Sequence, residues 1–246
     1  MTPDYKIYQY DTLPSTNQTA MEMAAEGAPE WTVVVAKHQS AGRGRLQRKF
    51  YSPEGTGLYM SVILRPHIAP SEALKITTAA AVSVAETLDA MFGVRAEIKW
   101  VNDILVEGKK VCGILTESRL SGSDLEFAVL GIGINLAPPT GGFPEEIKEI
   151  AGAVTDKVGD PQAVIRKFFE VFYPHYQNLN AEPCSFFPDY KARLCCLNRS
   201  VHILGEDGTR KQGVAVDLAP DFSLKVALED GGVKSLRAGE ISLRLS

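Results

Sequence analysis

Apolar residues recur with two different periods up to about residue 135 of the chain. Thr32 to Ala36 is an unbroken β-branched and apolar run, which predicts a buried strand. Pro70 to Phe92 is rich in alanine, carries apolar residues at helical spacing and ends before Gly93, which predicts a long helix packed on the core. Further strands are predicted at residues 5–10, 57–64, 96–100, 104–106, 111–117 and 125–134, and a helix from about Ser15 to Gly27.

The spacing of these strands indicates how they pair. Glu107 and Gly108 separate two strand patterns by only two residues, which is typical of a hairpin turn. Closely spaced strands joined by hairpins favour an antiparallel or mixed sheet over a repeating strand–helix–strand array. The sequence therefore predicts an α/β fold of the α+β kind.

The residues after about 135 predict two helices and then a series of short strands. Pro161 to Leu179 carries an aromatic stripe that we expect to belong to the core, and a short helix is predicted at residues 187–195. From Asn198 onward, short β segments are separated by turns, which predicts a small β barrel of roughly 50 residues that packs on the larger domain. The expected domains are residues 1–196 and 197–246, with Arg237 and Glu240 as further candidates for a role.

Composition and charge narrow the function classes. The chain of 246 residues is 45% hydrophobic and 23% charged, as in folded globular proteins. Its formal net charge of −4 disfavours a surface built for nucleic acid. Without a membrane-length apolar run or a signal-peptide pattern at the N-terminus, a cytoplasmic protein is expected. The cysteines fit no common zinc pattern and are expected to be reduced: Cys112, Cys184, Cys195 and Cys196.

The loop at residues 39–52 places glycine and arginine side by side. Gly42 and Gly44 allow the backbone to approach a ligand closely, while Arg43, Arg45 and Arg48 supply positive charge suited to phosphate or carboxylate. The loop lacks the Gly-Lys-Ser/Thr ending of a Walker A motif. Two other interpretations stay open, a solvated basic loop and a contact with an RNA backbone.

Four shorter segments carry polar or small residues at the ends and centres of predicted elements. Each also has a structural interpretation: a β-turn at residues 99–103, exposed hairpin lysines at 109–110, a bulge or an avoided packing clash at 131–135, and a helix cap at 15–17. In the same order, the functional alternatives are a phosphate or Mg²⁺ site, an anion site, a flat ligand that lies against the strand, and a site for a polar headgroup. The residues concerned are Ser15, Thr16, Asn17, Lys99, Asn102, Asp103, Lys110, Gly113, Gly131, Gly133 and Asn135.

In this order, the five segments resemble those of the biotin–protein ligases, over the chain from about Tyr8 to the C-terminus. The resemblance implies a mixed sheet with helices like that of class II aminoacyl-tRNA synthetases, followed by an SH3-like β barrel. It also implies an ATP-dependent enzyme that forms biotinyl-5′-AMP and then transfers biotin to one lysine of a biotin carboxyl carrier domain. The chain departs from the family's usual residues with Val101 for proline, Gln47 for glycine and Phe50 for tryptophan.

The resemblance also assigns roles to residues. Lys110, Arg45 and Lys99 would be catalytic, and Asp103 would hold Mg²⁺ beside ATP. The implied biotin-binding residues are Ser15, Thr16, Asn17, Gln39, Arg43, Gly44, Arg45, Lys110, Gly113, Gly131 and Gly133. The implied ATP- and adenylate-binding residues are Arg43, Arg45, Arg48, Phe50, Lys99, Asn102, Asp103 and Asn135.

Rival functions and partners follow from the same residues. The nearest rival is a lipoate–protein ligase or an octanoyl transferase, the latter with Cys112 as an acyl carrier. An RNA-binding adaptor is a rival from another class. Relatives that act as repressors carry an N-terminal helix-turn-helix domain, for which the motif at residue 15 leaves no room, so a monofunctional ligase without DNA binding is expected. The pattern allows either a monomer or a homodimer through sheet edges.

Overall fold

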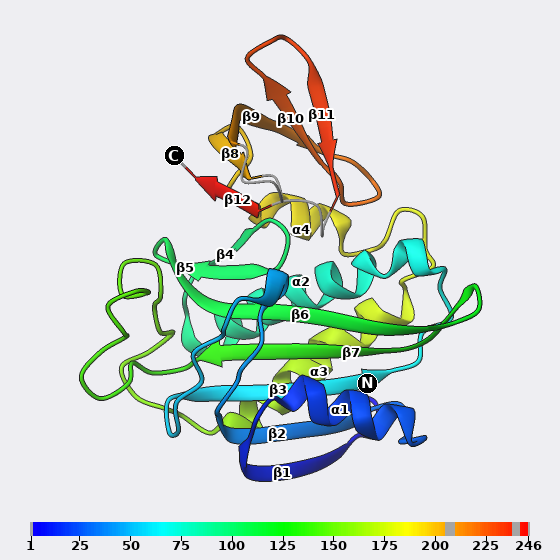
Figure 1. Cartoon of the computed structure of the whole chain (residues 1–246), viewed down its shortest axis with the longest axis vertical. Coiled ribbons are helices and arrows are strands. Elements are labelled where there is room, and N and C mark those ends of the chain that lie inside the picture. Colours follow the sequence, from blue (N-terminus) through cyan, green and yellow to red (C-terminus); the bar gives the residue numbers. More distant parts are fainter. Residues whose placement is uncertain (1, 205–209, 238–241, 246) are drawn as a thin grey trace.

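The computed structural model describes residues 2–204, 210–237 and 242–245, so Glu240 lies outside the described residues. A seven-stranded sheet forms the body of the molecule (Figure 1). Its strands, from one edge to the other, are β1 (Lys6–Leu13), β2 (Thr32–Gln39), β3 (Gly57–Leu64), β7 (Asp124–Asn135), β6 (Lys109–Ser121), β5 (Asp103–Val106) and β4 (Ala96–Lys99).

The large sheet is mixed, as predicted. β1 and β2 are parallel and are joined through helix α1 (Thr16–Ala25), whereas the other neighbouring strands are antiparallel. Glu107 and Gly108 both have positive φ, 51° and 75°, as the two central residues of a type I′ turn require. The predicted hairpin between β5 and β6 is therefore confirmed.

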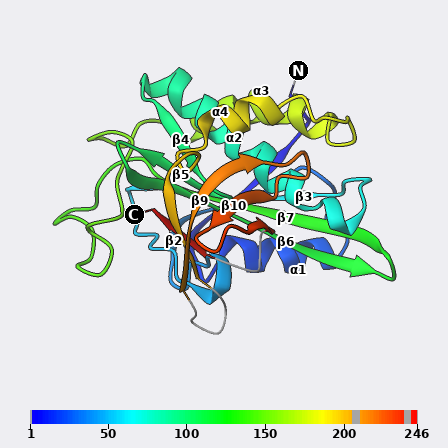
Figure 2. The same ribbon diagram turned by 90° about the horizontal axis from the view of Figure 1, so that it is seen from above.

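Helices cover both faces of the large sheet (Figure 2). Helix α1 buries Ala20 and Ala24 against one face, while α2 (Leu74–Phe92), α3 (Pro161–Gln177) and α4 (Phe187–Arg193) lie on the other. Alanines let α2 pack closely, and Gly93 ends it in the left-handed conformation. The predicted start at Pro70 was wrong, because Pro70–Glu72 forms a separate 3-10 turn before the helix.

The aromatic stripe of α3 belongs to the core, as predicted. Phe168, Phe169, Phe172 and Tyr176 are buried, and the ring of Trp31 makes edge contacts with three of them. Their burial excludes the stripe as an open binding surface.

A five-stranded antiparallel sheet follows where a small β domain was expected. Its strands in spatial order are β11 (Val233–Leu236), β10 (Leu224–Leu228), β9 (Arg210–Leu218), β8 (Ser200–Leu204) and β12 (Ser242–Leu245). The indole Nε1 of Trp100 donates to the carbonyl of Phe222 at 3.0 Å, and the Phe222 ring stacks on Phe186. The small sheet thus shares one continuous core with the large one, as expected.

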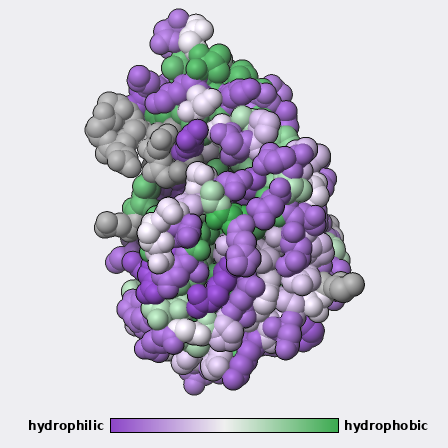
Figure 3. Space-filling view, turned by 90° about the vertical axis from the view of Figure 1, so that its right-hand side faces the viewer, coloured by the Kyte–Doolittle hydropathy of each residue, from purple (hydrophilic) through white to green (hydrophobic). Residues whose placement is uncertain are grey.

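The outer face of the small sheet remains partly apolar. Hydrophobic side chains gather near the top of the molecule, where this sheet lies (Figure 3). Val214, Val216 and Val233 are exposed, whereas Ala215, between the first two on β9, is buried. Among the described helices, none is long and apolar enough to cross a membrane. The four cysteines are free, as predicted.

Candidate functional site

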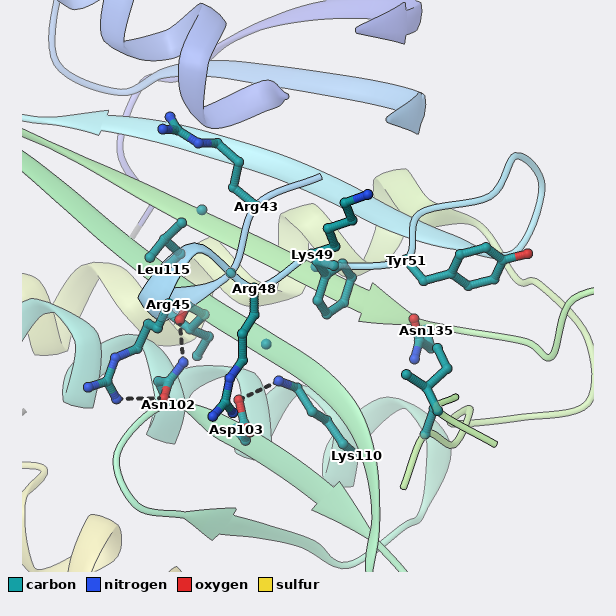
Figure 4. Close-up of a pocket in the computed structure, with 18 of the residues that line it drawn as sticks. Arg43, Arg45, Arg48, Lys49, Tyr51, Asn102, Asp103, Lys110, Leu115 and Asn135 are labelled. Atoms are coloured by element: carbon teal, nitrogen blue, oxygen red, sulfur yellow. Dashed lines mark hydrogen bonds and ion pairs between the residues drawn. The ribbon is translucent and has the colours of Figure 1, made fainter. Parts of the chain in front are cut away.

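One pocket of about 870 Å³ opens over the centre of the large sheet, beside the N-terminus of α1 (Figure 4). This volume is at the upper end for small-molecule sites. The site residues predicted from the sequence all line it: Ser15, Thr16, Asn17, Gln39, Arg43, Gly44, Arg45, Arg48, Phe50, Lys99, Asn102, Asp103, Lys110, Gly113, Gly131, Gly133 and Asn135. The fold therefore brings five distant segments together, while their individual roles stay predictions.

The floor of the pocket consists of two rows of paired residues across β6, β7 and β3. Gly131 lies between Leu115 and Ser61 in one row, and Gly133 lies between Gly113 and Tyr59 in the other. A Cβ atom at Gly131 would lie 2.0 Å from the Asn17 side-chain oxygen, and one at Gly133 would lie 2.5 Å from the Phe50 ring. The glycines thus make room for these two side chains, where a flat ligand against the strand was expected.

A buried polar cluster closes one end of the pocket. The backbone N–H of Thr16 donates to Gln39 Oε1 at 2.8 Å, and Gln39 Nε2 donates to the hydroxyl of Ser52 at 2.8 Å. Ser15 occupies the N-cap position of α1, but its hydroxyl makes no capping hydrogen bond. Ser15, Thr16 and Asn17 are each less than 5% exposed. Such a cluster suits a small polar group that offers both donors and acceptors.

The opposite end of the pocket is cationic. Arg45 Nη1 donates to the side-chain oxygen of Asn102 at 3.1 Å, and Asn102 Nδ2 donates to the carbonyl of Ile114 at 2.7 Å. Arg45 Nη2 is buried without a hydrogen-bond partner in the described part of the chain. Burial lowers the pKa of the Arg45 guanidinium, and the nearby carboxylate of Asp103 opposes this shift. A buried guanidinium nitrogen without a partner is a ready site for an anion.

We expect inorganic pyrophosphate to bind at this end of the pocket and to raise the melting temperature. Arg45→Gln should weaken pyrophosphate binding about 10- to 100-fold, because a hydrogen bond to a charged group is lost. Titration followed by thermal denaturation measures the effect. Arg119→Gln, which changes an exposed arginine paired with Glu126 outside the pocket, is the matched control. Equal affinities of the wild type and Arg45→Gln would exclude Arg45 as an anion ligand.

Lys110 and Asp103 form the centre of the cationic end. Lys110 Nζ lies 2.6 Å from a carboxylate oxygen of Asp103, and both side chains are partly exposed to the pocket. In Figure 4, the side chain of Arg48 extends toward the same carboxylate. The loop after β7 fixes the backbone of Lys110, because Lys110 N donates to the carbonyl of Ile150 and Gly152 N donates to that of Lys110. Asn135 Nδ2 also donates to the carbonyl of Gly152, at 3.0 Å.

The arginine loop folds over the pocket as a small hairpin. Phe50 N donates to the carbonyl of Gly42 and Gly44 N donates to that of Arg48, at 2.9 and 2.7 Å. A Cβ atom at Gly42 would lie 2.4 Å from the Phe50 carbonyl, so this close approach requires glycine. Arg43 pairs with Glu117 at 3.4 Å. The hairpin thus places Arg45 and Arg48 above the sheet while Arg43 remains at the edge.

Several pocket residues gave no signal in the sequence. The loop after β7, which no sequence pattern singled out, lines the pocket with Phe143, Glu146, Ile147, Glu149, Ile150 and Ala151. Ser61 and Glu117 hold the polar cluster in place. Only Ser61 offered a signal, as a polar residue in the otherwise apolar strand β3.

The donor set also tests whether the pocket fits Mg²⁺. Among the described residues, no group of three or more metal-ligating side chains converges. Asp103 supplies one carboxylate, already paired with Lys110. Mg²⁺ usually keeps several waters and takes further ligands from substrate phosphates. The residues present would therefore fit only an ion that arrives with a nucleotide, and Asp103 is the carboxylate that would hold it.

The segments that line the pocket match a known family. The model of the biotin/lipoate A/B protein ligase family matches residues 10–135, more than half of the chain. The chain belongs to this family. Its matched region contains every predicted site residue, from Ser15 to Asn135.

Individual relatives within the biotin/lipoate ligase family extend the comparison. The bifunctional ligase/repressor BirA of Bacillus spizizenii is 42% identical over 175 residues, which cover 70% of this chain and 54% of that protein. The chain thus spans about half the length of such curated relatives. The biotin–[acetyl-CoA-carboxylase] ligase of Mycobacterium tuberculosis is 30% identical over 89% of this chain and 81% of its own.

A solved member of the family has the same fold. The biotin protein ligase of Aquifex aeolicus, in complex with biotin and ATP, is 29% identical and superposes with a TM-score of 0.81 over 98% of this chain and 99% of that one. The predicted mixed sheet with helices and a small β domain after it is therefore confirmed, and the small domain, expected as an SH3-like barrel, is an antiparallel sheet of five strands.

Cys112 decides against an acyl-carrier chemistry at this site. Its side chain is fully buried on β6, and burial raises the pKa of its thiol well above the usual range. A buried thiol with a raised pKa is a poor nucleophile. The octanoyl transferase considered from the sequence would need this cysteine exposed, so the structure disfavours it.

Proposed function

We propose that the protein is an ATP-dependent biotin–protein ligase, which forms biotinyl-5′-AMP from biotin and ATP and transfers biotin to one lysine of a biotin carboxyl carrier domain. The observation that carries the proposal is the pocket itself, which joins a buried polar cluster at α1 to a cationic end at Lys110 and Arg45. Biotin has a polar ureido head and a carboxylate tail. The Aquifex aeolicus relative, whose structure contains biotin and ATP, supports the same pairing of ligands.

The polar end would bind the ureido head. This group offers one carbonyl acceptor and two N–H donors, which the hydroxyls of Ser15 and Thr16 and the amides of Asn17 and Gln39 can match. Gly113, Gly131 and Gly133 would lie beneath the bicycle and the chain of biotin, with the side chains of Asn17 and Phe50 between them and the ligand. The biotin carboxylate would then extend toward Arg43, Gly44, Arg45 and Lys110.

The cationic end would carry out the adenylation. A carboxylate oxygen of biotin attacks the α-phosphorus of ATP, and pyrophosphate leaves with the electron pair of the broken P–O bond. Lys110, Arg45 and Lys99 would bring the two anions together and stabilise the charge on the leaving group, with Arg48 beside them. Asn102, Asp103 and Asn135 would lie near phosphate or ribose, and the ring of Phe50 near adenine. Mg²⁺, held by Asp103 and the phosphates, would neutralise phosphate charge.

The second step would use the same pocket. The amine of the acceptor lysine attacks the acyl carbon of the mixed anhydride, an amide forms and AMP leaves with the bonding electrons. Because water would hydrolyse the anhydride, closure of the loop at residues 42–50 over it protects the intermediate. We further propose residues 1–196 as the catalytic domain, residues 197–246 as the C-terminal domain, and a cytoplasmic protein that does not bind DNA and works as a monomer or homodimer.

Intact-mass spectrometry of an apo biotin-acceptor domain tests the proposal. The acceptor is incubated with the protein, biotin and Mg-ATP, and parallel samples omit ATP or replace biotin by lipoate or octanoate. We expect a gain of one biotin only with ATP. A gain with lipoate in place of biotin would assign the protein to the lipoate ligases. No gain with any acid, from folded protein, would refute the ligase function.

A further inference from the structure

Ser61 is a buried hydroxyl behind the polar end of the pocket. It lies on β3 between Met60 and Val62, and its side chain is 0% exposed. Its Oγ is 2.6 Å from Asn17 Oδ1 and 2.8 Å from Thr16 Oγ1. A carboxamide oxygen only accepts hydrogen bonds, so in the shorter of these contacts Ser61 is the donor and Asn17 the acceptor.

The other side of the Asn17 amide is also fixed. Asn17 Nδ2 donates to Glu117 Oε2 at 2.9 Å and to the carbonyl of Leu115 at 3.3 Å. Both amide protons are therefore used within the protein. If the amide were flipped, its oxygen would face a carboxylate and a carbonyl, which offer no proton. The contacts thus specify one orientation of the amide.

This orientation presents an acceptor to the pocket. Asn17 Oδ1 lies directly above Gly131, on the pocket floor. It accepts one hydrogen bond from Ser61 and keeps a second lone pair. A ligand head that brings an N–H to this point satisfies the oxygen, whereas a head without such a donor leaves it desolvated and unpaired, at a cost in affinity.

We propose that Ser61 and Glu117 are positioning residues that hold the Asn17 amide with its oxygen toward the pocket and so make the site select acids whose heads carry N–H donors, as a cyclic urea does. The proposal rests on the proposed ligase function and names its source of head-group specificity. A dithiolane ring, the head of lipoate, carries no N–H and is rejected by the same atom.

Steady-state kinetics of Ser61→Ala test the role of Ser61. The variant removes the anchor on the oxygen side of the Asn17 amide, so we expect the KM for biotin to rise about tenfold while kcat and the KM for ATP stay within about twofold. Desthiobiotin keeps the urea but lacks the sulfur ring, and its KM should rise by the same factor. The inhibition constant of lipoate as a competitor should not rise, so the preference for biotin over lipoate should fall about tenfold.

Ser83→Ala is the matched control for removal of a buried hydroxyl. Ser83 is also 0% exposed, but it lies on α2 and donates to the carbonyl of Ala79, away from the pocket. Its variant should lower the melting temperature by a similar amount without changing the KM for biotin. Ser61→Cys, whose larger thiol donates only weakly, should also raise the KM for biotin.

Two variants of Glu117 test the other anchor. Glu117→Val removes the acceptor for Asn17 Nδ2 and should raise the KM for biotin. Glu117→Gln keeps an acceptor oxygen and should restore most of the affinity, although it also loses the ion pair with Arg43. Equal losses in both variants would assign the effect to Arg43 instead of the amide.

The outcomes separate this inference from the proposed function. If the wild type does not biotinylate an acceptor, the ligase function itself fails. If the wild type is active and Ser61→Ala leaves the KM for biotin and the preference over lipoate unchanged, the positioning role is refuted. A fall in kcat together with melting temperature, without a change in preference, would also overturn it.

Discussion

Lys110→Ala is expected to slow adenylate formation by about two to three orders of magnitude, the usual effect of removing one charge-stabilising donor from an active site. Lys110 Nζ lies 2.6 Å from Asp103 at the cationic end of the pocket. Without it, Asp103 loses its ion pair and the leaving pyrophosphate loses a cation. Biotin-dependent exchange of pyrophosphate into ATP measures this step alone.

Folding should change far less than activity in this variant. A partly exposed ion pair contributes about 0–1 kcal/mol to stability, so the melting temperature should fall by only a few degrees. Lys109→Ala is the matched control, because the neighbouring amine binds the main chain of Glu149 and does not line the pocket. Its exchange rate should stay within about twofold of the wild type. Proportional losses of exchange and of melting temperature in Lys110→Ala would contradict a role for Lys110 in the chemistry.

Local patterns in the sequence were sufficient for most of the elements. The turn at Glu107 and Gly108 was predictable because its two residues alone determine the hairpin geometry. The core face of α3 was predictable because aromatic residues recur at helical spacing. The start of α2 was not, since Pro70 suits both a first helical turn and the 3-10 turn observed. No separate strand was predicted at Ser242–Leu245, where β12 lies.

The partners of the site residues could not be read from the sequence. Lys110 and Asp103 were both candidates, but their ion pair depends on the register between β5 and β6, which includes an irregularity after Ile104. No role was predicted for Glu117, which accepts a hydrogen bond from Asn17 in the structure. Contacts between distant segments, such as Asn17 with β6, depend on the order of the strands, which no local pattern specifies.

Gly131→Ala is expected to weaken biotin binding about a hundredfold. The new Cβ atom would lie 2.0 Å from Asn17 Oδ1, far inside van der Waals contact, so Asn17 must leave its position. Overpacking of this kind costs about 1–3 kcal/mol, and the displaced amide loses its bonds to Ser61 and Glu117 as well. Isothermal titration with biotin measures the loss. Gly159→Ala, at a glycine whose added Cβ meets no atom within 4 Å, should bind biotin normally.

The double variant Asn17→Ala/Gly131→Ala separates two reasons for the glycine. If Gly131 exists to make room for the Asn17 amide, removal of that amide relieves the overlap, so the melting temperature should recover while biotin binding remains weak. If the ligand itself needs the space above Gly131, the double variant should bind biotin more weakly than Asn17→Ala alone. The first result would show that Gly131 is required by protein packing and not by the ligand. The sheet has no side chain at this position, and helix α1 can therefore place the acceptor oxygen of Asn17 there.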